Sequence, residues 1–270
     1  MTTAADLRCA PVLLMLAGGM ALTGCDTTGP TDRGSLAISV ATRRSGISSS
    51  RSSDVLVGTG ANSLRITKVE FVLAETELSQ ASSCSASNED DEDDCDEIEL
   101  DPILVDLPLD GVPPRKVIDA LVPAGTYTRI ETKLRAITKG DDDEKGAAKF
   151  IAAHPNWPSA LSVRVAGVYT DAGGAAHDFT FTSSAKSELE MAFASPVKVD
   201  ATTENLTITV DVARWFKDAA GNAVDPRSSA NSGLINTNIR KSFKAFKDND
   251  RDAHDDDQGE DEDEPDDDKG

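Results

Sequence analysis

The stretch LRITKVEFVL, residues 64 to 73, carries the pattern that decides the fold. Apolar residues alternate with polar ones along it, with one step out of phase, at Leu64, Ile66, Val69, Phe71 and Leu73. Alternation with a period of two is typical of a β-strand with one buried face. The change of phase after Ile66 indicates a shift of register within the strand. The sequence therefore predicts one long, irregular strand here.

The same alternation recurs along the chain, at residues 128–136, 161–167, 179–181, 189–193 and 206–212, with further candidates at 35–40, 98–109 and 116–122. Turn-forming pairs such as Gly173-Gly174 and Gly221-Asn222 separate these segments. Repeated short strands between turns indicate an all-β sandwich, and polar outer faces suit an antiparallel sheet that is wetted on one side. We expect one Ig-like or transthyretin-like antiparallel β-sandwich domain at residues 35–230, with mobile loops at 41–62 and 84–97.

A short amphipathic helix is expected at residues 231–247. Its apolar residues recur at helical spacing, at Ile235, Ile239, Phe243 and Phe246. Such a stripe packs on a sandwich or, if the basic face meets anionic lipid, lies on a membrane surface. The acidic residues that follow would oppose lipid binding, so packing on the sandwich is the favoured interpretation.

The N-terminus has the order of a secretory signal peptide, residues 1–24, because a polar start is followed by an apolar stretch too short to span a bilayer. It ends in Leu-Thr-Gly-Cys, which resembles the lipobox of bacterial lipoproteins. We expect Cys25 to be lipidated and residues 25–34 to form a tether. The protein would then be anchored in the bacterial cell envelope, with membrane and leaflet undetermined. An ordinary cleaved signal is the alternative.

The formal net charge of −21 is concentrated in short segments. Residues 88–99, 141–144 and 248–270 together carry −25, so the rest of the chain nets +4. Acidic runs of this kind are generally solvated and disordered, and we expect a disordered acidic tail at 248–270. The field repels phosphate, which makes nucleic acid an improbable partner.

Cys84 and Cys95 are the two thiols left after removal of the signal and lipidation of Cys25. An exported chain with two thiols usually pairs them, so a disulfide is expected. Two free thiols or two zinc ligands are the alternatives, and zinc lacks the further ligands it needs because the three histidines lie far apart in the sequence.

Two acidic segments are candidate calcium ligands. They comprise Glu89, Asp90, Asp91, Glu92, Asp93 and Asp94 in the loop between the cysteines, and Asp248, Asp250 and Asp252 in the tail. Carboxylates on flexible loops bind calcium weakly outside the cytoplasm. The tail fails as an EF-hand, because Ala253 replaces the turn glycine and Gly259 the bidentate glutamate. Counter-ions from solvent would also relieve the repulsion without any site.

No catalytic motif stands out, so an enzyme is the less favoured interpretation. The sequence lacks a G-x-S-x-G elbow, an H-E-x-x-H pair and a phosphate-binding G-x-x-x-x-G-K. Trp157, between two prolines, is a candidate platform for a sugar or peptide ligand, although a tryptophan that plugs the end of a sandwich is the commoner case.

Three segments together resemble a domain-of-unknown-function family of bacterial lipoproteins with a "PAGTY"-type core: ITKVEF at 66–71, LVDLPL at 104–109 and VPAGTY at 122–127. Residues 162–167 and Arg214-Trp215-Phe216 are similar to the later part of the same group. The resemblance implies a sandwich and carries no activity. We expect a lipid-anchored, non-catalytic binding or structural module whose partner is an envelope protein or glycan. The alternatives are a calcium-dependent interaction protein and an envelope hydrolase.

Overall fold

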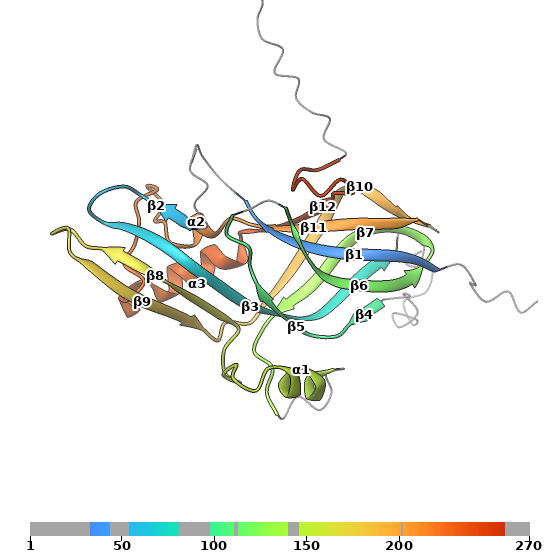
Figure 1. The fold of residues 1–270 in the computed structure, drawn as a ribbon, viewed down its shortest axis with the longest axis horizontal. Helices are drawn as coiled ribbons and strands as arrows, with labels where there is room; N and C mark the ends of the chain where they lie inside the picture. Colours follow the sequence, from blue (N-terminus) through green and yellow to red (C-terminus); the bar gives the residue numbers. More distant parts are fainter. Residues whose placement is uncertain are drawn as a thin grey trace, which may run out of the picture. The chain divides into compact units, whose positions relative to one another are not determined.

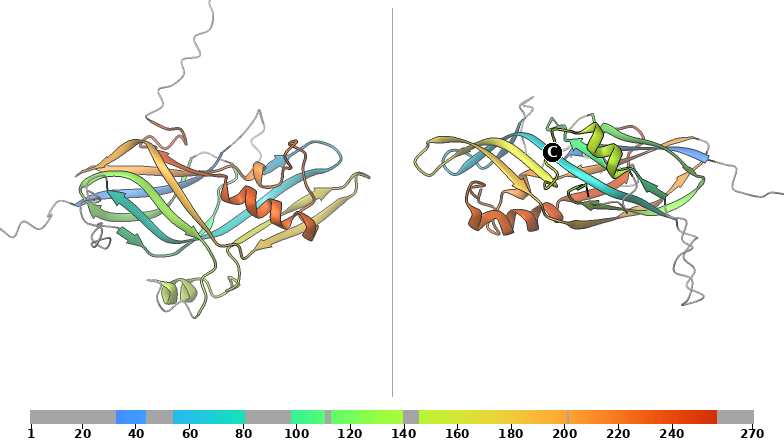
Figure 2. Two further views of the ribbon diagram at one scale, coloured as in Figure 1. Left: turned by 180° about the vertical axis from the view of Figure 1, so that it is seen from behind. Right: turned by 90° about the horizontal axis from the view of Figure 1, so that it is seen from below.

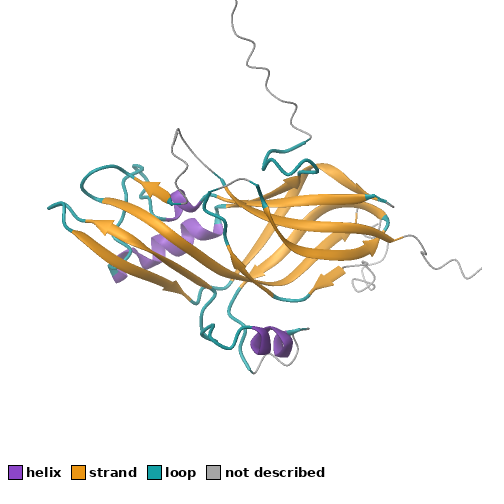
Figure 3. Ribbon diagram, in the orientation of Figure 1, coloured by secondary structure: helices purple, strands orange, loops and turns teal. Residues whose placement is uncertain are grey.

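Strands dominate the described part of the chain (Figures 1 and 3). The computed structural model describes residues 33–43, 54–80, 98–110, 113–139, 146–200 and 202–256. Strands make up 53% of the described residues and helices 12%. The strands form two sheets, antiparallel or mixed, which confirms the mostly β fold.

The smaller sheet has four strands in the order β12 (Phe243–Lys247), β11 (Thr203–Val210), β1 (Arg33–Thr42) and β6 (Arg115–Pro123). β1 is parallel to β11, and the other pairs are antiparallel. The larger sheet runs β10 (Ser187–Val199), β7 (Gly125–Leu134), β3 (Ser63–Gln80), β8 (Val163–Thr170) and β9 (Ala176–Ser183). Three short strands also pair with β3: β2 (Val55–Val57), β4 (Ile98–Leu100) and β5 (Ile103–Asp106).

Strand β3 joins the two ends of the larger sheet. Its first part pairs with β8 as far as Phe71, and its second part pairs with β7 from Leu73 onward. The ladder with β8 shifts register between Ile66 and Lys68, which confirms the change of phase expected from the sequence.

One hydrophobic core joins the two sheets. Along β8 the burial alternates, with Val163 and Val165 buried, as one-sided strands require. Phe243 of β12 meets Phe71 of β3 edge-on at 5.5 Å between ring centroids and lies 6.4 Å from the ring of Trp215. These aromatic contacts tie the small sheet to the large one, because rings of this size bury the most apolar area per residue.

Short helices lie at two places beside the larger sheet (Figure 2). α2 (Val212–Trp215), the 3₁₀ helix η1 (Ser229–Asn231) and α3 (Ser232–Arg240) lie near β8 and β9. There, Phe216 contacts the rings of Phe179 and Phe181 at 6.0 and 5.9 Å. α1 (Ala147–Ala153) forms a second, smaller core with Val72 and Ala74 of β3.

The helix expected at 231–247 is correct only in its first half. Ile235 and Ile239 are buried on α3, as expected, but the helix ends at Arg240 and residues 243–247 form β12. The physical reason is the edge of β11, whose backbone groups pair with β12 from Leu206 to Val210. A ladder satisfies a row of backbone donors and acceptors that a continued helix would leave to water.

Several other expected boundaries change. Arg33 and Gly34, assigned to the tether, begin β1, and the loop expected at 41–62 contains the end of β1 and all of β2. The expectation of disorder from Asp248 onward is wrong for residues 248–256, which hydrogen-bond to β11 and β12. Strand pairing and burial outweigh the polar composition of these segments.

The expected signal peptide, Cys25, the Cys84–Cys95 pair, the carboxylates 89–94 and the tail beyond Asp256 lie outside the described residues. Among the helices that the structure describes, none is long and apolar enough to cross a membrane.

Candidate metal centre

The candidate site is the C-terminal acidic loop, residues 248–256, which follows the edge strand β12. Asp248 extends the ladder by donating its backbone N–H to the carbonyl of Asn205 at 2.9 Å. The loop then returns, and Asp256 donates its backbone N–H to the carbonyl of Lys247 at 3.1 Å. Asn249 secures the loop to β11, because its Oδ1 accepts a hydrogen bond from the backbone N–H of Asn205 at 2.8 Å.

A buried polar network lies beneath the loop on β1 and β11. Ser39 Oγ donates to Asn205 Oδ1 at 2.9 Å, and Asn205 Nδ2 donates to Thr207 Oγ1 at 3.2 Å and to the backbone carbonyl of Asp248 at 2.7 Å. Ser39, Asn205 and Thr207 are 0–2% exposed. The side chains of Ser39, Asn205 and Thr207 therefore form a buried polar surface beneath the loop, and Asn205 hydrogen-bonds to the loop directly.

Asp248 is a fully buried carboxylate, with 0% of the residue exposed. Its Oδ1 accepts from the backbone N–H of Asp252 at 2.9 Å and its Oδ2 from that of Ala253 at 3.3 Å, and Thr207 adds a side-chain hydrogen bond. Burial nevertheless raises the pKa of Asp248 above its ordinary value, because these neutral donors only partly replace water. A cation at this position would remove the cost.

Two further carboxylates lie beside this buried group. One oxygen each from Asp248, Asp250 and Asp256 lies within 4.8 Å of the others. Calcium binds oxygen ligands at about 2.3–2.6 Å, so oxygens on a common ion are at most about 5 Å apart. The spacing fits a shared calcium ion.

One residue of the loop has the left-handed conformation that glycine adopts at the sixth position of an EF-hand loop. Asp248, Asp250 and Asp256 stand at the first, third and ninth positions of a loop counted from Asp248, three of the positions that supply ligands in an EF-hand. The sixth position, Ala253, has φ of 69°, the left-handed conformation usually reserved for glycine. Ala253, which departs from the EF-hand sequence pattern, therefore adopts the conformation of the glycine that it replaces. The twelfth position, Gly259, lies outside the described residues.

The described carboxylates that cluster differ by one residue from the tail ligands predicted from the sequence, which stay a prediction. Asp252 turns away from the cluster, since its Oδ1 accepts the backbone N–H of His254 at 2.7 Å and its Oδ2 lies 3.3 Å from His254 Nδ1. Asp256 lies in the cluster instead. The one signal in the sequence that could have identified Asp256 is its ninth position in the loop.

Trp157 is not presented as a platform, which corrects the sequence-based hypothesis. The residue is 8% exposed and lies in the second core with Phe150, and its Nε1 donates to the carbonyl of Leu161 at 3.0 Å. The guanidinium of Arg164 lies over the indole ring, 4.8 Å from its centroid. The indole is enclosed because α1 and the loop after it pack over Val72 of β3.

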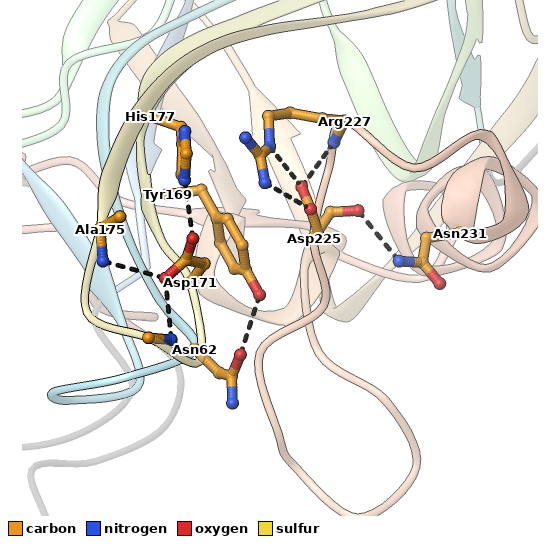
Figure 4. A network of polar contacts seen from close by, with 9 residues as sticks. Asn62, Tyr169, Asp171, Ala175, His177, Asp225, Arg227 and Asn231 are labelled. Atoms are coloured by element: carbon orange, nitrogen blue, oxygen red, sulfur yellow. Dashed lines mark hydrogen bonds and ion pairs between the residues drawn. The ribbon is translucent and has the colours of Figure 1, made fainter.

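A second polar network lies between the β8–β9 hairpin and the loop after α2 (Figure 4). His177 Nε2 is 2.8 Å from Asp171 Oδ2, while Asp171 Oδ1 accepts two backbone N–H groups of its own turn, each at 2.9 Å. The His177 contact and these backbone donors hold the pKa of Asp171 below its ordinary value. Arg227 binds both carboxylate oxygens of Asp225, at 3.0 and 2.8 Å, and lies over the ring of Tyr169.

This network joins the β8–β9 hairpin to the loop after α2, because Arg227 lies over the ring of Tyr169. In the part of the chain that the structure describes, no serine, threonine or cysteine side chain is hydrogen-bonded to His177. A histidine–carboxylate pair needs such a nucleophile within reach to act in acyl transfer.

No family model matches the chain, and no curated protein matches it. Among solved structures, MbnP from Methylosinus trichosporium aligns with 73% of this chain and 81% of its own, at 10% identity and a TM-score of 0.35.

Proposed function

We propose that the chain is an exported, lipid-anchored β-sandwich protein of the bacterial cell envelope that binds calcium through its C-terminal acidic loop. The anchor is inferred from the Leu-Thr-Gly-Cys stretch that ends at Cys25. In this proposal the protein acts as a non-catalytic interaction module, its sandwich is of the Ig-like or transthyretin-like type, and its partner is an envelope protein or glycan.

The observation that carries the calcium proposal is the burial of Asp248. A carboxylate with 0% exposure lies within 4.8 Å of oxygens from two further carboxylates. Burial of an ionised carboxylate costs free energy unless a positive charge or several donors compensate, and nearby like charges add to the cost. One divalent cation would neutralise most of this charge.

Calcium is the divalent ion that the donor set favours. The three side chains offer only oxygen atoms, whereas zinc and copper sites usually include imidazole or thiolate. Magnesium demands a near-octahedral arrangement and keeps much of its water, while calcium accepts irregular shells of six to eight oxygens. Backbone carbonyls of the loop and water would complete the shell. Exposed Asp250 and Asp256 favour weak binding, with a Kd of about 10⁻⁴ to 10⁻³ M.

Isothermal titration of the mature protein with calcium tests the proposal. We expect saturable binding that is lost in Asp250→Asn/Asp256→Asn. This variant leaves buried Asp248 intact, and its amide oxygens can still accept the backbone N–H groups of Asn249 and Asp252 that the two carboxylates accept. Asp178→Asn/Glu188→Gln removes two exposed carboxylates of the larger sheet and is the control matched in charge. Equal affinity in the two variants would refute a site in the loop.

The same titration distinguishes calcium binding at the second acidic segment, residues 89–94, from binding at the C-terminal loop. We propose that the Cys84–Cys95 disulfide holds these carboxylates as a weaker calcium site. Cys84→Ser/Cys95→Ser would then lose only this weaker binding and retain the affinity of the C-terminal loop. Identical isotherms for this variant and the wild-type protein would show that the segment is a solvated spacer.

A further inference from the structure

A groove of about 500 Å³ lies next to the acidic loop, where β10 and β12 approach each other. These are the end strands of the two sheets, so the groove opens along a seam of the sandwich. Its apolar lining includes Met191 and Phe193 of β10 and Phe246 of β12. A site of this size is typical for a small organic ligand.

The groove follows from an irregularity in β10. The ladder with β7 passes from Ala192 opposite Arg129 to Val197 opposite Tyr127, so four residues of β10, 193–196, have no partner across the ladder. One of them, Pro196, has no backbone N–H to donate. Extra residues on one strand bend it away from its neighbour, and this bend places Phe193 in the groove.

Two cations at the groove, Arg43 and Lys244, have no acidic partner among the residues that the structure describes. Within the described ranges, the side chains of Arg43 and Lys244 make no ion pair and no hydrogen bond. The nearby carboxylates are already engaged, since Glu190 lies 3.5 Å from Arg129 and Asp255 has a polar contact of its own. Arg43 is held in place by its backbone N–H, which donates to the carbonyl of Val210 at 2.9 Å. An anion could therefore bind here despite the net charge of −21.

We propose that this groove binds an amphipathic anion, a compact apolar body that carries a single carboxylate, sulfonate or phosphate group. The apolar body lies on Met191, Phe193 and Phe246, and the anionic group binds Arg43 and Lys244. Hydrogen bonds between such cations and an anion are stronger than neutral ones, and the apolar wall limits competition from water. The proposal goes beyond calcium binding and does not depend on it.

Fluorescence titration with 8-anilinonaphthalene-1-sulfonate, an aromatic sulfonate, is the test, followed by displacement with octanoate. The mature protein is measured with excess calcium and again with chelator, so that a change in the loop is not mistaken for a change in the groove. We expect one saturable site, displaced by octanoate. Arg43→Glu/Lys244→Glu should weaken binding at least tenfold, while Lys186→Glu/Arg214→Glu, which makes the same change in charge at two exposed residues, should not.

A further variant tests the apolar wall, and circular dichroism and thermal melting confirm that each protein is folded. Phe193→Ser should weaken binding of the sulfonate severalfold, because it removes part of the apolar lining. Phe193 is only partly buried where it packs against the core, so we expect the variant to fold. Binding that is non-saturable, or within twofold of wild type in Arg43→Glu/Lys244→Glu, would overturn the proposal. Displacement by an acidic peptide but not by octanoate would overturn it too, since the occupant would then be a polypeptide.

Discussion

Truncation of the C-terminus distinguishes the folded loop from the rest of the acidic tail. Removing residues 258–270 should leave the stability unchanged, whereas removing 249–270 should lower it. The second cut deletes Asn249, which accepts the backbone N–H of Asn205 at 2.8 Å, and Asn205 is 2% exposed. It also deletes the backbone donors of Asp252 and Ala253 that satisfy Asp248.

The size of the effect follows from the donor that is lost. A buried N–H without an acceptor costs about 1–3 kcal/mol. The carboxylate of Asp248 adds little, because truncation also exposes it to water. For a domain of this size 1 kcal/mol shifts the melting temperature by about 2–4 °C. We therefore expect the longer truncation to melt roughly 2–12 °C below wild type when calcium is chelated.

Differential scanning calorimetry in chelator measures both truncations under one condition. Asn249→Ala is the point variant that removes only the acceptor, and it should account for most of the loss. A melting temperature within 1 °C of wild type for the 249–270 deletion would refute the structural role of the loop. It would also mean that residues 249–256 add no stability to the sheet.

Three further predictions concern the core, a strand pair and the anchor. Burial acts to raise the pKa of Glu70, but Arg164 at 2.7 Å and Lys68 outweigh it and keep this pKa below the ordinary value. Glu70→Gln should therefore lower the free energy of unfolding by about 1–3 kcal/mol at neutral pH. Urea melts should show that the difference in stability between wild type and variant shrinks as the pH falls through the lowered pKa of Glu70, and a pH-independent difference would contradict this. Gly167→Ala would place a Cβ 2.3 Å from the carbonyl oxygen of Arg65. The variant should therefore unfold at a lower urea concentration, equivalent to a loss of about 1–3 kcal/mol in stability. An unchanged midpoint would contradict the close approach of β3 to Gly167. Cys25→Ala should leave the protein unprocessed or release it to the soluble fraction, and normal processing with membrane retention would exclude lipidation.

Much of the sheet structure could be predicted from local alternation, because most strands have one buried and one wet face. β8 and β9 show this pattern along their whole length. The parallel pairing of β1 with β11 could not be predicted, since it joins residues more than 160 positions apart. Ala37, Ser39 and Ala41 are buried on the other side of β1 as well, so this strand lacks the contrast between faces on which the alternation depends.

The candidate metal centre was predictable in part. Alternate aspartates indicated Asp248 and Asp250, because closely spaced carboxylates are typical of calcium loops. The exchange of Asp252 for Asp256 depends on the left-handed turn at Ala253 and on the contact between Asp252 and His254. Both are properties of the folded loop that residue types alone do not determine. The burial of Asp248 likewise requires the buried polar side chains of β1 and β11, strands that are distant in sequence from the loop.

The most direct test of the calcium proposal is a crystal structure of the mature protein grown with millimolar calcium. We predict one ion at about 2.3–2.6 Å from oxygens of Asp248, Asp250 and Asp256, identified by its anomalous signal. Electron density that shows no ion between these three side chains would contradict the proposal. An ion bound only at residues 89–94 would contradict it as well.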